Sequence, residues 1–149
     1  MLRIDHVDLA VRDVARSLRF YLAVLGPLGL HEWKRFPSYR GTEEIVYLAL
    51  AADGGEQYLG LRQADGGEHR YHEVGLEHLA FYVDSREEVD AAHQRCLEIG
   101  ARIHFPPEED RDLDGYYEMF VFDPDGFRIE IAYGPPEEMG AQPPLTTSR

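Results

Sequence analysis

Two stretches of the chain alternate between apolar and polar residues, which is the period of a half-buried β-strand. They run from Ile4 to Val11 and from Leu76 to Val83. In each stretch one set of alternate residues is apolar, and the other set carries a histidine, His6 in the first and His78 in the second. We therefore predict two equivalent strands, each with one face on a core and one polar face.

A helical pattern follows each of these strands. Asp13 is a suitable N-cap for a helix with an apolar face, and Gly26-Pro27 would end it. Ser85 and Glu88 have the spacing of a capping box at the start of a second helix. Gly100 is a natural stop for that helix. The chain thus repeats the order strand, then helix.

After each helix, two β-type segments flank a turn rich in Asp, Gly and Pro. The predicted pairs are 44–50 with 57–62, around Asp53-Gly54-Gly55, and 118–122 with 127–133, around Asp123-Pro124-Asp125-Gly126. One further strand should precede each hairpin, near 32–36 and near 102–105. The offset of 72 positions between His6 and His78 recurs between Gly54 and Gly126, so the repeat extends through both halves.

The repeat predicts an α+β fold in which two βαβββ modules form a curled mixed sheet. We place the first module at 1–66, a linker at 67–73, the second module at 74–135 and a flexible tail at 136–149. Neither module has enough strands to bury its own sheet, so the two should associate as one domain.

Composition narrows the functional classes. The 149 residues carry a net charge of −13 and contain no basic run, which argues against nucleic acid and anionic membranes as partners. No segment is apolar enough to span a membrane, and the N-terminus lacks a signal-peptide pattern, so we expect a cytoplasmic protein. Cys96 is the only cysteine, and its place on an apolar helix face favours a buried thiol.

Three residues with metal-binding side chains should share one sheet face. Ile129 and Ile131 point to the core, so Glu130 points to the opposite face, as His6 and His78 do. Two imidazoles and one carboxylate suit Fe, Mn, Ni, Co or Zn as a divalent ion and leave coordination positions open. The alternative is three unrelated polar residues on exposed strands. The equivalent positions of the two histidines favour one divalent metal ion.

The chain resembles the vicinal oxygen chelate superfamily, which includes glyoxalase I, extradiol dioxygenases, and fosfomycin- and bleomycin-resistance proteins. The segments that carry the resemblance are Ile4-Asp5-His6-Val7, the run from Gly75 to Phe81, and the run from Phe122 to Ile131. The resemblance covers roughly residues 1–135. It implies that His6, His78 and Glu130 are the metal ligands, and that the paired sheets form a U-shaped cleft around the ion.

Departures from the family patterns narrow the activity. Members with four protein ligands place a Glu, Gln or His on the last strand of the first half, at the position that matches Glu130. Gly60 stands there, because its apolar neighbours Leu59 and Leu61 match Ile129 and Ile131. Gly60 would then leave a coordination position open, unless it marks a β-bulge. Extradiol dioxygenases carry a Tyr and a His at the positions of Phe120 and Gln63, so the resemblance argues against ring cleavage.

Three further residues are candidates for catalytic roles. Arg62 is on the inward face and would bind a substrate carboxylate, or else simply reach solvent. Tyr116 would wall the cleft or cover the outer sheet. Tyr82 shares the parity of His78 and would donate a hydrogen bond in the pocket. His72, in the linker, is better explained as a surface residue than as an acid–base group.

Two functional hypotheses follow. The favoured one is a divalent-metal-dependent lyase, isomerase or dioxygenase-like enzyme that chelates two oxygens of a small, oxygen-rich substrate. The alternative is a resistance protein of the bleomycin-binding type that sequesters a small antibiotic or toxin. Tight metal binding would favour the enzyme, and a dry aromatic groove without metal would favour the binder. The resemblance also implies a homodimer.

Overall fold

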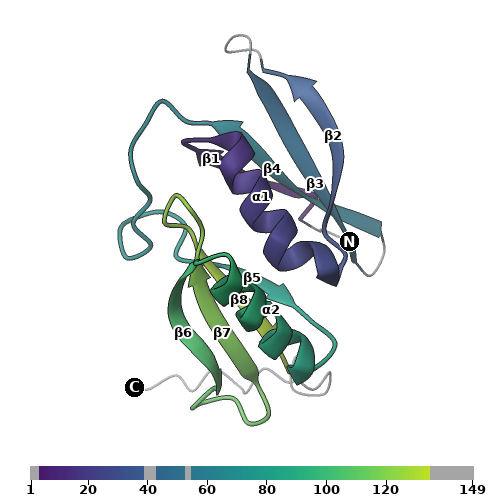
Figure 1. Ribbon diagram of the computed structural model, residues 1–149, viewed down its shortest axis with the longest axis vertical. Helices are drawn as coiled ribbons and strands as arrows, with labels where there is room; N and C mark the ends of the chain where they lie inside the picture. Colours follow the sequence, from purple (N-terminus) through teal and green to yellow (C-terminus); the bar gives the residue numbers. More distant parts are fainter. Residues whose placement is uncertain (1–3, 39–42, 53–54, 135–149) are drawn as a thin grey trace, which may run out of the picture.

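The computed structural model describes residues 4–38, 43–52 and 55–134, and these form two runs of the same order of elements (Figure 1). The first run is β1 (His6–Val11), α1 (Val14–Leu25), the 3₁₀ turn η1 (Gly26–Leu28), β2 (His31–Pro37), β3 (Glu44–Ala52) and β4 (Gly55–Gln63). The second run is β5 (Leu79–Tyr82), α2 (Arg86–Glu98), β6 (Arg102–Glu109), β7 (Tyr117–Phe122) and β8 (Arg128–Tyr133). The α+β fold of two βαβββ modules is confirmed.

Each module has a four-stranded mixed sheet of the same topology. The strand orders are β1-β4-β3-β2 and β5-β8-β7-β6, with the first pair of each sheet parallel and the others antiparallel. Among the described residues no strand of one sheet pairs with a strand of the other, so the sheets do not close into one curled sheet. β1 and β5 are therefore edge strands, and they lie beside the two histidines of the repeat.

Side-chain caps start both helices where the sequence predicts them. The Asp13 carboxylate accepts a hydrogen bond of 2.9 Å from the backbone N–H of Arg16. The Ser85 hydroxyl accepts one of 3.3 Å from the backbone N–H of Glu88, and the Glu88 side chain accepts one from the N–H of Asp84. Gly100 ends α2 with a φ of +67°, which favours glycine. The predicted helix boundaries are confirmed to within a residue or two.

The strand before α2 is shorter than predicted. Pairing begins at Leu79 instead of Leu76, because the preceding chain is tied back in a turn. His69 Nε2 lies 2.8 Å from the Leu76 carbonyl oxygen, and Gly75 adopts a φ of +152°. His78 thus lies just outside the β5 ladder, whereas His6 is the first residue of β1.

The apolar positions of both modules meet in one core. α1 and α2 each lie across one face of their own sheet (Figure 1), and the same cluster contains Leu9 and Leu61 from the first module and Ile129 and Ile131 from the second. Cys96 lies fully buried in it, as its position on the apolar face of α2 predicts. No helix of the described residues covers the opposite face of either sheet, and we call this face the open face.

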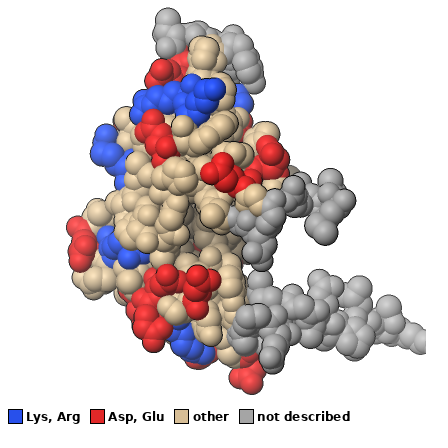
Figure 2. Space-filling model, turned by 90° about the vertical axis from the view of Figure 1, so that its right-hand side faces the viewer, with Lys and Arg blue, Asp and Glu red and all other residues tan. Residues whose placement is uncertain are grey.

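The surface mixes charges of both signs. Figure 2 shows Asp and Glu side chains interspersed with Lys and Arg over one face, with uncharged surface between them. In the described part of the chain no helix is long and apolar enough to cross a membrane.

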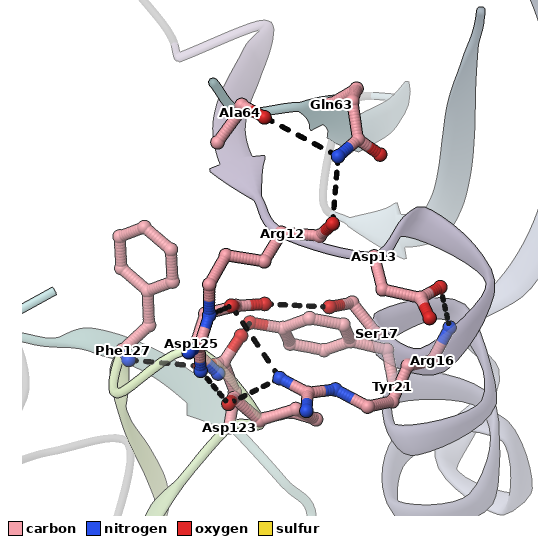
Figure 3. Close-up of polar contacts among 11 residues, drawn as sticks. Arg12, Asp13, Arg16, Ser17, Tyr21, Gln63, Ala64, Asp123, Asp125 and Phe127 are labelled. Atoms are coloured by element: carbon pink, nitrogen blue, oxygen red, sulfur yellow. Dashed lines mark hydrogen bonds and ion pairs between the residues drawn. The ribbon is translucent and has the colours of Figure 1, made fainter. Parts of the chain in front are cut away.

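A buried polar junction joins the two modules at the Asp123–Gly126 turn (Figure 3). Asp125 accepts hydrogen bonds from Arg12 Nε at 2.6 Å and from the Ser17 hydroxyl at 3.2 Å. Asp123 accepts one of 3.0 Å from the Tyr21 hydroxyl. Both carboxylates are almost fully buried, so their pairing with the first module is what makes that burial tolerable.

Candidate functional site

His78 and Glu130 meet on the open face of the second sheet. His78 Nε2 lies 3.0 Å from Glu130 Oε2, while its Nδ1 pairs with the neighbouring Glu77 carboxylate. Glu130 is central in β8 and 5% exposed, whereas the imidazole of His78 remains open to solvent. An imidazole nitrogen that solvent can reach, next to a carboxylate oxygen, is a pair of ligand atoms that divalent cations prefer.

Tyr116 and Glu118 complete the surroundings of Glu130. The Tyr116 hydroxyl donates a hydrogen bond of 2.7 Å to Glu130 Oε1, which leaves Oε2 directed at His78. Glu118 is on the same face, one strand over, and burial together with the Glu130 carboxylate raises the pKa of Glu118 to about 8. Two carboxylates this close form a site that a bound cation would stabilise.

Apolar and cationic groups border this pair. Phe120 lies opposite Glu130 in the β7–β8 ladder, and its ring meets the His78 ring edge-on at 5.7 Å between centroids. The Arg128 guanidinium lies 3.8 Å from the centroid of Phe120 and pairs with Glu77. Glu77 thus links Arg128 to His78, so the imidazole is held from two sides.

His6 lies apart from this pair, on the first sheet. Its Nδ1 is 2.8 Å from Asp5 Oδ2, and its ring meets Tyr47 edge-on at 5.9 Å. Among the described residues no three His, Cys, Asp or Glu side chains come together as a metal-binding group. Within one chain the structure thus unites two of the three predicted ligands, and the triad stays a prediction.

Asp8 occupies the space beside Gly60 that the sequence suggested was open. The Asp8 carboxylate pairs with Arg62 and accepts a hydrogen bond of 3.2 Å from the Tyr47 hydroxyl. A Cβ atom at Gly60 would overlap this carboxylate and lie 2.9 Å from Tyr47 Cε1. Gly60 therefore makes room for the Asp8–Arg62–Tyr47 cluster instead of leaving a vacant coordination position.

An aromatic pocket lies next to this cluster and to His6. It has a volume of about 420 Å³, and its walls include the rings of Trp33, Phe36, Tyr47 and Tyr58. Sequence reasoning missed Trp33 because a bulge between Glu32 and Lys34 shifts the strand register at that residue. Asp8 and Glu118 were also missed as site residues, although their parity with His6 and Glu130 was readable from the alternation.

The three predicted catalytic residues have different surroundings. Tyr116 holds Glu130, and Arg62 is engaged by Asp8. Tyr82 donates a hydrogen bond to the Gly134 carbonyl oxygen and accepts one from the Gly134 N–H, so it ties β5 to the end of β8. None of these roles requires a substrate, and each remains a hypothesis for catalysis.

Comparisons with known proteins agree with this architecture. The family model of the Glyoxalase/Bleomycin resistance protein/Dioxygenase superfamily matches residues 3–131. The uncharacterized protein YqjT of Bacillus subtilis is 30% identical over 132 residues, covering 85% of this chain and 94% of YqjT.

Solved structures share the fold. A glyoxylase/bleomycin resistance protein/dioxygenase domain from Frankia sp. EAN1pec has a TM-score of 0.73 and 26% identity, covering 91% of this chain and 94% of that one. The fosfomycin resistance protein FosX of Listeria monocytogenes, complexed with Mn(II) and sulfate, has a TM-score of 0.68 and 18% identity, covering 93% and 98%. At 18% identity, the similarity to FosX shows a common fold and nothing about activity.

Proposed function

The chain belongs to the Glyoxalase/Bleomycin resistance protein/Dioxygenase superfamily, and on that premise we propose that it is a divalent-metal-dependent enzyme. Its substrate is a small oxygen-rich molecule that binds the metal through two oxygens. The observation that carries the proposal is the approach of His78 Nε2 to Glu130 Oε2, at 3.0 Å, beside a second carboxylate.

The side chains present fit a divalent cation. His78 and Glu130 would hold it, with His6 as the third ligand, and FosX, which has the same fold, is known with Mn(II). When bound, such an ion acts as a Lewis acid that polarises substrate oxygens. Tyr116 fixes the Glu130 carboxylate through its hydrogen bond, which is the outer-shell support that metal ligands commonly have.

A second copy of the chain is the natural source of His6. The two sheets of one chain stay separate, and the edge strands β1 and β5 offer unpaired backbone next to His6 and His78. Exposed edges favour pairing with another chain. In a homodimer with two-fold symmetry, the first sheet of one copy would face the second sheet of the other, so that each dimer forms two equivalent sites.

The reaction class follows from the groups around the site. Phe120 presents an apolar ring to His78, and Gln63 donates its amide to the Arg12 carbonyl oxygen at 2.7 Å, so neither offers a proton-transfer group. We therefore favour lyase or isomerase chemistry over the cleavage of catechol rings. A location in the cytoplasm is also part of this proposal.

Metal analysis of the purified protein tests the proposal directly. We expect one divalent ion per chain after loading with Mn(II), and loss of tight binding in His6→Ala, His78→Ala and Glu130→Ala. His93→Ala, on α2, is the matched control and should bind like the wild type. Unchanged Mn(II) affinity in Glu130→Ala would refute the metal centre.

Sequestration of a small molecule is the second candidate, and the aromatic pocket beside His6 favours it. A binder would retain its ligand unchanged and would not need the metal. If a ligand binds the metal-free protein and the Glu130→Ala variant with the same affinity as the metal-loaded wild type, and is not converted, the protein is a binder and not an enzyme.

A further inference from the structure

The pocket beside His6 has the size and lining of a small-molecule site. Its volume of about 420 Å³ falls within the range of roughly 300–1,000 Å³ of ligand pockets. Apart from the hydroxyl groups of two tyrosines, the polar side chains that line it are Asp5, His6 and Arg62. Such sites combine apolar walls with a small number of orienting polar groups.

The rings in this pocket are arranged around an accessible indole. Trp33 packs on Tyr58 at 4.7 Å between centroids and on Phe36 at 6.0 Å, while Phe36 meets Tyr47 edge-on at 5.6 Å. The rings thus support one another from three strands. Trp33 remains 47% exposed, so much of its surface is not covered by its neighbours.

The charges near the pocket do not form a cluster suited to a phosphonate. The Arg62 guanidinium is held by Asp8 and lies 3.4 Å from the Tyr47 hydroxyl oxygen. Lys34 Nζ lies 5.0 Å from the Phe36 ring centroid, at cation–π distance. The pocket therefore offers ring faces first and isolated polar groups second.

The open face of the second sheet also carries aromatic rings, beside His78, as the first sheet does beside His6. Phe120 contacts the His78 ring, and Phe105, 42% exposed, meets Phe120 edge-on at 6.1 Å. His104 and Phe122 extend this group, with 5.0 Å between their centroids. Aromatic surface therefore lies beside all three candidate metal ligands.

We propose that this pocket binds a planar aromatic group, so that the small oxygen-rich substrate carries an aromatic ring. The aromatic group would lie against Trp33, and the oxygens would reach the metal next to His6. The second half of this statement rests on the proposed function, whereas the first half does not need the metal. A small ligand is favoured over a second copy as the occupant because the pocket is a hollow with polar groups at one side.

Two probes with the same chelating group measure the aromatic contribution. 2-Naphthohydroxamate and acetohydroxamate both bind metals through two oxygens, and 2-naphthamide keeps the ring system without the hydroxamate. Trp33 is the only tryptophan in the chain, so quenching of its fluorescence reports occupancy of the pocket. We expect the naphthyl hydroxamate to bind the Mn(II)-loaded protein about tenfold tighter or more than the acetyl one.

Variants test whether Trp33 is responsible. In Trp33→Leu, calorimetry should show the naphthyl preference reduced to about threefold or less, with acetohydroxamate affinity unchanged. Leu97→Ala, an exposed position on α2, is the control and should keep the full preference. Equal affinity of the two hydroxamates in the wild type would overturn the proposal. So would a Trp33→Leu variant that stays dimeric and keeps the full naphthyl preference, because the aromatic group would then bind away from Trp33.

The metal-free protein separates the two hypotheses. If 2-naphthamide quenches Trp33 without metal, and Mn(II) does not tighten the hydroxamates, the aromatic site stands and the metal enzyme fails. If Mn(II) tightens both hydroxamates alike and the naphthyl group adds nothing, the metal site stands and the aromatic site fails.

Discussion

At the scale of single residues, the structure assigns Gly60 a steric role. The strand ladders align it with Glu130, since Gly60 lies opposite Asp8 in β1 and Glu130 lies opposite Ala80, the residue 72 positions after Asp8, in β5. The repeat could not show that Asp8, on the adjacent strand, would fill the space above the glycine. A glycine can stand beside an open coordination position or beside a closely packed side chain, and the sequence looks the same in both cases. Only the positions of the neighbouring side chains distinguish the two.

We therefore predict that Gly60→Ala destabilises the protein by about 1–3 kcal/mol, because the new methyl group displaces the Asp8 carboxylate from Arg62. Gly60→Glu should be worse, and should not add a metal ligand. Ala91→Ser, at an exposed position of α2, is the control and should change stability by no more than about 0.5 kcal/mol. Chemical denaturation measures all three, and a fully stable Gly60→Ala would contradict the packing around Asp8.

Cys96 gives a second prediction at this scale. It is completely buried, and this burial raises the pKa of its thiol to about 11. We expect no reaction with a thiol reagent such as DTNB at pH 8 in native buffer, and one equivalent in guanidinium chloride, since the thiolate is the reactive form. Rapid native labelling would mean that the core formed by α2 opens readily.

At the scale of elements, the sequence predicted most of what the structure contains. Alternation located the strands, and Asp13 and Ser85 marked the helix starts, because these signals depend on local physics alone. The bulge at Trp33 and the late start of β5 escaped prediction. The bulge depends on the register of the β2–β3 ladder, and the start of β5 depends on the contact of His69 with Leu76. The pattern of apolar and polar residues contains neither.

The Asp123–Gly126 turn illustrates the same limit. Its Pro and Gly predicted a hairpin turn, but not that Arg12, Ser17 and Tyr21 of the first module would bury it. The turn therefore acts as a junction between modules. The hydrogen bonds that water would make to its two carboxylates come instead from neighbouring protein donors. Loss of either the donors or the carboxylates should therefore destabilise the protein.

Asp123 allows a sharp test of this junction. Burial raises the pKa of Asp123, although the N–H groups of Asp125 and Phe127 and the Tyr21 hydroxyl oppose the shift. A carboxyl group with a raised folded pKa binds its proton more tightly in the fold. Its ionisation therefore lowers stability as pH rises from about 4, the unfolded pKa, through the folded pKa.

Asp123→Asn removes that charge and retains one acceptor oxygen for the N–H groups of Asp125 and Phe127, while its amide NH2 takes the place of the oxygen that accepts from Tyr21. We expect its free energy of unfolding, relative to wild type, to increase between about pH 4 and pH 7. Asp123→Ala should lose about 2–4 kcal/mol at every pH, because Tyr21 and two backbone donors lose their acceptor. Parallel pH profiles for wild type and Asp123→Asn would show that Asp123 ionises freely in the fold.

At the scale of the whole molecule, the separation of His6 from His78 and Glu130 is the feature with the largest consequence. The sequence placed all three on equivalent faces, and the structure keeps that equivalence. Equivalence of faces does not imply contact, because in the described part of the chain no strand of one sheet pairs with a strand of the other. We therefore propose that a site with all three ligands would form between two copies of the chain.

Mixed dimers distinguish a shared site from a site within one chain. We expect that chains carrying His6→Ala and chains carrying Glu130→Ala each bind no Mn(II) tightly on their own. Co-expressed with two different tags and purified on both, they form dimers in which one chain retains His6 and the other retains His78 and Glu130. If sites are shared, one of the two sites is intact, and metal analysis gives half of the wild-type content.

The matched control combines His78→Ala with Glu130→Ala. Both changes lie in the second module, so every shared site contains one defect, and no tight Mn(II) binding should return. If the first pair also stays empty, although light scattering shows a dimer, the sharing of His6 between copies is wrong. Restoration in both pairs would mean instead that His78 and Glu130 act in different sites, which their approach at 3.0 Å contradicts. Only recovery restricted to the pair that includes His6→Ala agrees with a centre completed across the dimer.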